Sequence, residues 1–178
     1  MGTTVYPHRE RQRVLLTGLL PDISTDPAIE TATDSVEAGR SGTIVAPVGI
    51  RPPLLAAVAT RAATPLVVLT ATGRDAETLT NALASWIPGV AMLPAWETLP
   101  HERLSPQVDT MARRIAVLRR LVHPVAGDES AGPISVLVIP IRAFLQPIIS
   151  GLADLEPVRV RTGDILDLTD VTNRLAEL

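Results

Sequence analysis

The stretch Pro65–Leu93, PLVVLTATGRDAETLTNALASWIPGVAML, decides the fold class. It opens with Pro65–Ala71, an apolar run rich in valine and leucine that is typical of a strand buried on both faces. Asp75–Ile87 then predicts an amphipathic helix, because its apolar residues recur every three or four positions. Pro88-Gly89 marks the end of that helix, and Val90–Leu93 predicts a second short strand.

The same alternation continues on both sides of this stretch. Upstream, Thr43–Pro47 is a β-branched apolar run that predicts a strand, and Pro52–Ala63 predicts a helix that begins with proline. Downstream, a helix is predicted from about Gln107 to Val122, and a strand over Ser135–Ile139. Apolar strands that alternate with helices are typical of a parallel sheet with right-handed connections. The sequence therefore predicts an α/β fold, a doubly wound parallel sheet flanked by helices.

The chain divides into three predicted regions. Residues 1–40 are a lead-in with one short helix, and residues 41–155 carry the strand–helix alternation. Residues 156–178 differ, because arginine alternates with apolar residues and a final helix, capped by Thr169, reaches Leu178 without a stop signal. We expect this last region to be the truncated start of a second, α+β domain.

Composition excludes several kinds of chemistry. The 178 residues include no cysteine, which excludes disulfides, thiolate metal sites and cysteine nucleophiles. All 16 basic residues are arginine, so a Walker-type phosphate loop and Schiff-base chemistry have no lysine. A net charge of −3 and 2% aromatic residues argue against nucleic-acid binding. No stretch has the apolar length of a membrane span or a signal peptide, so we expect a cytoplasmic protein without membrane contact.

The first strand-to-helix junction, Ala46–Arg51, lies where a nucleotide-binding loop would lie in such a fold. It has one glycine and neither lysine nor a hydroxyl ligand for a metal ion. Pro52 and Pro53 follow it, and they remove two amide donors that a helix N-terminus would offer an anion. We therefore predict a structural turn, no cofactor and no nucleotide-dependent activity for this chain.

Acid–base and metal chemistry have weak support. His101 and Glu102 are the best local acid–base candidates, and a small α/β enzyme that uses them is the alternative hypothesis. A triad of Ser105, His101 and Asp109 lacks the glycine-flanked elbow of such enzymes, and Asp109 fits better as a favourable charge in the first turn of a helix. No pair of histidines has metal-ligand spacing, so neither a metal site nor a catalytic residue is predicted.

Helix 107–122 carries two arginine pairs. Its spacing predicts that Arg113 and Arg120 lie on a solvated face and that Arg114 and Arg119 flank the apolar stripe. A third hypothesis, binding of phosphates by the basic face, remains open here. The residues predicted to face the core are Met111, Ile115, Leu118 and Val122.

The stretch Leu93–Thr110, LPAWETLPHERLSPQVDT, resembles the N-terminal region of bacterial transcription-repair coupling factor (Mfd). In that family a W-E-T-L-P segment, a short loop, S-P and an aspartate open a long helix. The residues that carry this resemblance here are Trp96, Glu97, Thr98, Leu99, Pro100, Ser105, Pro106 and Asp109. The flanking LVVLTATGRDAETL and SVLVIPIRAFLQP segments are similar too, and the resemblance extends from about Gly18 to Leu178.

The resemblance implies a UvrB-like module that consists of a degenerate RecA-like domain without a working nucleotide site and the start of a second domain that docks on UvrA. It also implies that a full-length parent, an ATP-dependent DNA translocase, uses ATP and Mg²⁺ in further motor domains. Such a parent displaces stalled RNA polymerase and recruits the excision-repair machinery. Arg159 and Arg161, in the region that resembles the second domain, are the candidate docking residues on this chain.

Overall fold

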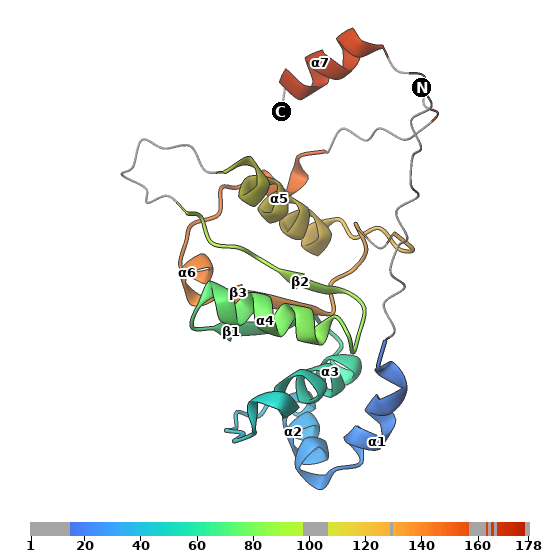
Figure 1. Ribbon diagram of the computed structural model, residues 1–178, viewed down its shortest axis with the longest axis vertical. Coiled ribbons are helices and arrows are strands. Elements are labelled where there is room, and N and C mark those ends of the chain that lie inside the picture. The colour runs from blue at the N-terminus through green and yellow to red at the C-terminus, as the bar shows by residue number, and fades with distance from the viewer. Residues whose placement is uncertain are drawn as a thin grey trace, which may run out of the picture.

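The computed structural model describes residues 15–97, 107–128, 130–156, 163, 165 and 167–176, and the side chains of 167–173 in the last range. Its centre is a parallel sheet of β1 (Leu66–Thr70), β2 (Val90–Met92) and β3 (Val136–Pro140), in the order β1-β3-β2 (Figure 1). The central strand β3 is buried along its whole length, as its apolar sequence predicts. The α/β class and the parallel sheet flanked by helices are thus confirmed.

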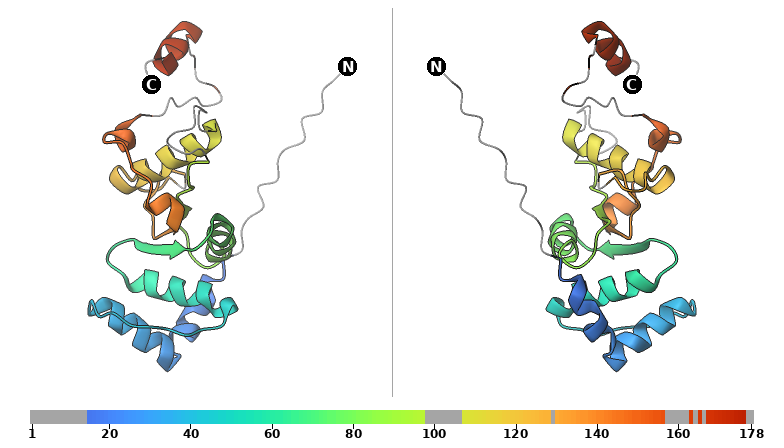
Figure 2. Two further views of the ribbon diagram at one scale, coloured as in Figure 1. Left: turned by 90° about the vertical axis from the view of Figure 1, so that its left-hand side faces the viewer. Right: turned by 90° about the vertical axis from the view of Figure 1, so that its right-hand side faces the viewer.

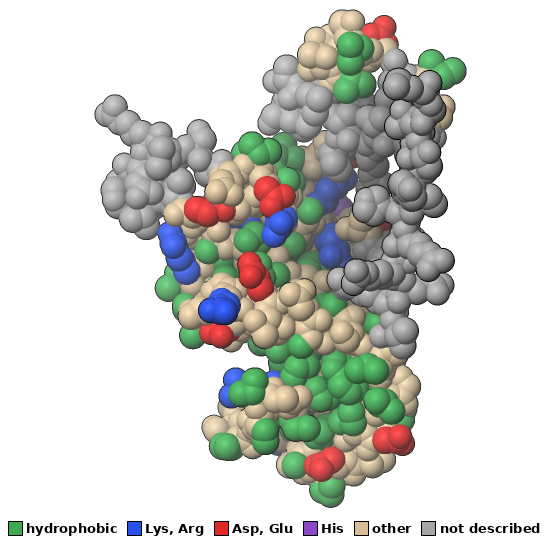
Figure 3. All heavy atoms as spheres, in the orientation of Figure 1, with side chains coloured by type: hydrophobic (Ala, Val, Ile, Leu, Met, Phe, Trp, Pro, Cys, Tyr) green, Lys and Arg blue, Asp and Glu red, His purple; other side chains and the backbone are tan. Residues whose placement is uncertain are grey.

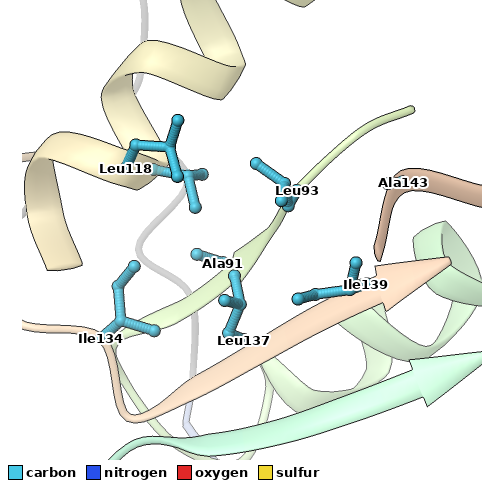
Figure 4. Packing of buried hydrophobic residues seen from close by; sticks show 8 residues of the cluster. Ala91, Leu93, Leu118, Ile134, Leu137, Ile139 and Ala143 are labelled. Atoms are coloured by element: carbon cyan, nitrogen blue, oxygen red, sulfur yellow. The ribbon is translucent and has the colours of Figure 1, made fainter. Parts of the chain in front are cut away.

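Helices cover both sides of the strands. On one side, α3 (Arg51–Arg61) and α4 (Gly73–Leu83) share an apolar cluster with Val136 and Val138. On the other side lie α5 (Val108–Val122), α6 (Ile141–Phe144) and the 3₁₀ turn η3 (Leu152–Asp154), as Figures 1 and 2 show. Figure 4 shows the second cluster, in which Leu118 of α5 faces residues from β2 and β3; its buried members are Ala91, Leu93, Val117, Leu118, Ile134, Leu137, Ile139 and Ala143.

The described part of the lead-in folds onto α3. A 3₁₀ turn η1 (Thr17–Leu19) precedes α1 (Leu20–Ser24) and α2 (Pro27–Glu37), whose apolar residues pack on α3. Arg61 at the end of α3 pairs with Asp34 at 2.9 Å and Glu37 at 2.7 Å. The last described element is α7 (Leu168–Ala176). Among the described residues, no helix has the length and apolar character needed to cross a membrane.

Two local features fix the connections before and after α4. The Thr72 side chain accepts a hydrogen bond of 3.1 Å from the Asp75 amide and so caps the start of α4. Gly89, which follows α4, has φ +75°, and a Cβ there would lie 2.8 Å from Ser135 Oγ and 2.9 Å from Pro133 O. Only glycine accepts that backbone conformation at that close approach.

The strand predicted over Thr43–Pro47 is wrong. The segment is irregular, and Val45 is 96% exposed. Within the described residues the segment pairs with no strand, although the outer edges of β1 and β2 have no strand partner there. An extended segment without a neighbouring strand leaves its backbone groups to water and is not held in a sheet.

The buried face of α5 also differs from the prediction. Met111 and Val122 are exposed, at 37% and 57%, whereas Thr110 and Arg114 are buried together with Val117 and Leu118. The helix is therefore turned so that Arg114 enters the interior. Leu118 is buried as predicted, but apolar spacing placed Arg114 only beside the stripe, because it assigns no core position to a charged side chain.

Candidate functional site

The turn between residue 47 and α3 is the first candidate site. Val48–Ile50 forms a 3₁₀ turn (η2) that runs directly into α3. The Ile50 amide donates to Pro47 O at 3.0 Å, and the Arg51 amide donates to Val48 O. Both amides are therefore used inside the turn, and the next two residues are prolines without N–H groups. The donors that hold a phosphate at a helix N-terminus are largely missing from the start of α3.

The second candidate site is the Trp96 junction, which we define as Trp96, Glu97, Thr110, Arg114 and Gln146. It joins the segment after β2 to α5 and to the residues that follow α6. The Trp96 amide donates to Gln146 Oε1 at 2.8 Å, and Gln146 Nε2 donates back to Trp96 O at 3.3 Å. One side-chain amide thus pairs with the tryptophan backbone as a neighbouring strand would.

Arg114 provides the buried part of the Trp96 junction. Its guanidinium lies over the Trp96 ring, with 4.5 Å from Cζ to the ring centre, and its Nη1 donates to Pro94 O at 2.6 Å. Nε and Nη2 of the same group are buried without a hydrogen-bond partner. Burial lowers the pKa of Arg114 from its ordinary value, although an arginine stays charged at neutral pH. A cation held mainly by an aromatic face and one carbonyl is costly to bury.

Glu97 provides the acidic part of the Trp96 junction. Its carboxylate accepts a hydrogen bond from the Thr110 hydroxyl in the first turn of α5. This hydrogen bond is the main reason that the pKa of Glu97 lies below its ordinary value. From α6, Arg142 donates to the Glu97 backbone carbonyl at 3.2 Å, so Glu97 is held from two directions.

A third group of contacts holds residues 152–156 on α5. Arg119 donates to Leu155 O at 3.2 Å and lies 3.7 Å from the Glu156 carboxylate. His123 Nε2 lies 2.7 Å from Asp154 Oδ1. These contacts fix the chain on α5 immediately before the region in which the second domain is predicted to begin.

The remaining predicted residues either belong to α5 or lie outside the described residues. Asp109 is in the first turn of α5, as predicted, and pairs with Arg113 at 2.7 Å. The solvated position predicted for Arg120 is wrong: its Nε donates to Gly132 O at 2.8 Å, and burial lowers its pKa. The predicted residues outside the described part are Thr98, Leu99, Pro100, His101, Glu102, Ser105, Pro106, Arg159 and Arg161.

The charged side chains on the face drawn in Figure 3 have no single sign. In Figure 3, acidic and basic side chains lie interspersed over the part of this face above α3, and hydrophobic side chains gather over α1 to α3. Within the ranges that the structure describes, no group of three or more histidine or acidic residues could hold a metal ion.

Sequence reasoning missed Arg114, Thr110, Gln146 and Arg142 as members or neighbours of the Trp96 junction. One sequence signal could have found Arg114. It lies about one helical turn after Thr110, which is the last residue of the stretch that contains Trp96. Gln146 gives no comparable local signal, because its partner is 50 residues away.

The chain is similar in sequence to known proteins. No family model matches the chain. Among curated proteins, the transcription-repair-coupling factors of Mycobacterium bovis and Mycobacterium tuberculosis are each 46% identical to it over 138 residues, or 76% of the chain. The match spans 11% of the length of each of these relatives.

Proposed function

Because the chain is a relative of the transcription-repair-coupling factors, with a match consistent with their N-terminal region, we propose that it works as a non-catalytic module of such a factor. In this proposal the whole protein acts on DNA and RNA polymerase, and it uses ATP and Mg²⁺ in other domains. The module itself binds no nucleotide. Its task is to hold the following domain in place and present it to UvrA.

One observation carries the non-catalytic part of the proposal. At the start of α3, where the sequence predicts a strand-to-helix junction but the described residues hold no strand before the helix, two amides are used within the η2 turn and two more positions are proline. The chain also has no lysine to reach the outer phosphates of ATP. The backbone of positions 50 to 53 therefore offers no free donor to a phosphate, and the loop has no lysine.

The contacts on α5 support the positioning role. Arg119 and His123 hold residues 154–156 against the helix, directly before the proposed docking region. The Trp96 junction ties the same helix to β2 and α6, which makes α5 a fixed support. In the proposal, UvrA then binds residues C-terminal to Glu156, with Arg159 and Arg161 in the contact.

Two experiments test these parts separately. Isothermal titration calorimetry of the chain with MgATP is expected to give no binding heat, and a micromolar Kd would contradict the non-catalytic role. Surface plasmon resonance with immobilised UvrA is expected to detect the chain. The R159A/R161A variant should bind at least tenfold more weakly, while R113A, an exposed control on α5, should bind like the unmodified chain. Equal binding by all three would contradict the docking assignment.

A further inference from the structure

A short segment that follows α6 lies against α5. We call residues 152–156, which comprise η3 and the two residues after it, the strap. Leu152 and Ala153 of the strap are partly buried and pack on the apolar cluster that contains Val117 and Leu118 of α5. Figures 1 and 2 show the strap beside α5. The strap therefore joins α5 to the region that is predicted to belong to the second domain.

Two side chains of α5, one helical turn apart, supply the polar contacts to the strap. Arg119 donates to Leu155 O at 3.2 Å and lies 3.7 Å from the Glu156 carboxylate. His123 Nε2 lies 2.7 Å from Asp154 Oδ1. The side chains of His123, Asp154 and Glu156 are 47%, 66% and 78% exposed. Because water and salt screen such exposed pairs, they contribute little to stability, and the polar hold on the strap is weak.

The backbone of the strap is not bonded to α5. Within the described residues no backbone hydrogen bond joins the two. The Leu152 amide donates to Ile149 O at 3.3 Å, and the Asp154 amide donates to Gly151 O at 3.0 Å, so both donors are used locally. Movement of the strap away from α5 therefore breaks no backbone hydrogen bond of the sheet or of α5. Segments held by exposed polar contacts and few buried apolar ones open at low free energy while the core stays folded.

Gly151, directly before the strap, has the properties of a hinge. Its φ is +82°, and no atom lies within 4 Å of the position that a Cβ would take. Glycine changes between left-handed and right-handed backbone conformations at little cost. Hinges of moving segments lie in a few loop residues that absorb such changes. The strap therefore combines a weak hold on α5 with a pivot at its N-terminal end.

We propose that the strap detaches reversibly from α5, by rotation at Gly151, while the sheet and α5 stay folded. In the attached state, Arg119 and His123 restrain the chain that follows the strap. In the detached state, that chain changes its orientation relative to the sheet, and burial of Leu152 and Ala153 favours the return. The proposed positioning function supplies the purpose of this movement, whereas the movement itself is inferred from the contacts of the strap and from Gly151.

The distance between two spin labels measures the movement in the 178-residue chain. The chain has no cysteine, so V108C/E156C supplies two unique labelling sites and leaves the contacts of Leu155 and Asp154 in place. Val108 is 77% exposed and lies about 16 Å from Arg119 along the helix axis. Pulsed double electron–electron resonance is expected to show a narrow distance distribution for the attached state. A minor population at longer distances is expected for the detached state.

Loss of the two α5 side chains should favour detachment. In the labelled chain, R119A/H123A removes the polar hold and is expected to enlarge the longer-distance population at least threefold. R113A is the matched control, because Arg113 is an exposed arginine of the same helix that pairs with Asp109, and it should leave the distribution unchanged. An unchanged distribution in R119A/H123A, with helical circular dichroism retained, would overturn the proposal.

G151A tests the hinge while both α5 side chains stay in place. Alanine disfavours a φ of +82°, so the attached conformation should lose stability and the longer-distance population should grow. Gly127 has the same φ of +82° and the same open surroundings, so G127A introduces matched strain away from the strap and should leave the distribution unchanged. Equal distributions for G151A and G127A would overturn the hinge. A chain that shows the movement but does not bind UvrA would contradict the docking assignment alone.

Discussion

The guanidinium of Arg114, which is fully buried, lies over the ring of the partly buried Trp96, 4.5 Å from its centre. This pair links the segment after β2 to α5, and the Pro94 carbonyl and Gln146 complete the link. The tryptophan and glutamate of the sequence signature are therefore parts of one structural junction. Their role here is to fix α5, against which residues 154–156 are held.

Removal of the Arg114 side chain is expected to destabilise the fold. Arg114→Ala leaves a cavity beneath Trp96 and an unpaired Pro94 carbonyl, at a cost of about 2–4 kcal/mol in the free energy of unfolding. Arg114→Met fills much of the volume and removes two buried nitrogens that have no hydrogen-bond partner, so it should cost about 1 kcal/mol or less. Urea denaturation followed by circular dichroism measures both.

Arg113→Ala is the matched control, because Arg113 is exposed and pairs only with Asp109 across one helical turn. Its expected effect is below about 0.5 kcal/mol. Equal losses for the alanine variants at 113 and 114 would contradict the assignment of Arg114 to the core.

Glu97 is expected to make stability depend on pH in the acid range. Its pKa in the folded chain lies below the ordinary value of 4.5, chiefly because of the Thr110 hydrogen bond. A depressed folded-state pKa contributes stability that is complete above the unfolded pKa and is lost as pH falls through the folded pKa. The contribution should therefore be present at pH 7 and decline below about pH 4.5.

Thermal unfolding from pH 7 to pH 3 measures this dependence. Glu97→Gln should flatten the acid part of the curve, since the amide does not titrate and keeps an acceptor for Thr110. Glu77→Gln, on α4, provides a carboxylate control. An acid slope unchanged by Glu97→Gln would rule out the Thr110 hydrogen bond as its source.

Gly89, directly before β2, is expected to tolerate substitution poorly. Gly89→Ala places a Cβ 2.9 Å from a backbone carbonyl at φ +75°, so the turn must shift, at a cost of about 2–3 kcal/mol. Gly49→Ala, where no atom lies within 4 Å of the added Cβ, should change stability by less than about 0.5 kcal/mol. Chemical denaturation of the two variants compares them, and a Gly49 effect as large as the Gly89 effect would contradict this account of the turn.

The three strands and the main helices could be predicted because their signals are local. β1 and β3 are continuous apolar runs, and α4 has a threonine cap and regular apolar spacing. Thr43–Pro47 carries the same local signal but has no neighbour to pair with, and a strand depends on that distant partner. The rotation of α5 was equally inaccessible, since it follows from Arg114 stacking on Trp96 across 18 residues of sequence.

Only part of the Trp96 junction was predictable from the sequence. Trp96, Glu97 and Asp109 were singled out by their resemblance to a family signature, and the structure describes each of them. Their partners Gln146 and Arg142 come from a segment that gives no signal of this contact. The sequence alone shows that the chain has no lysine and that Pro52 and Pro53 have no N–H group. Neither observation depends on the folded geometry.

Thermal unfolding of the chain with and without 5 mM MgATP tests the central claim, that this domain has no phosphate grip, most directly. A site with a Kd of about 10 μM would raise the free energy of unfolding by roughly 3.7 kcal/mol at that concentration, which would move Tm by several degrees. The account predicts no change in Tm beyond that produced by an equal concentration of magnesium chloride. A rise of several degrees specific to MgATP would contradict it.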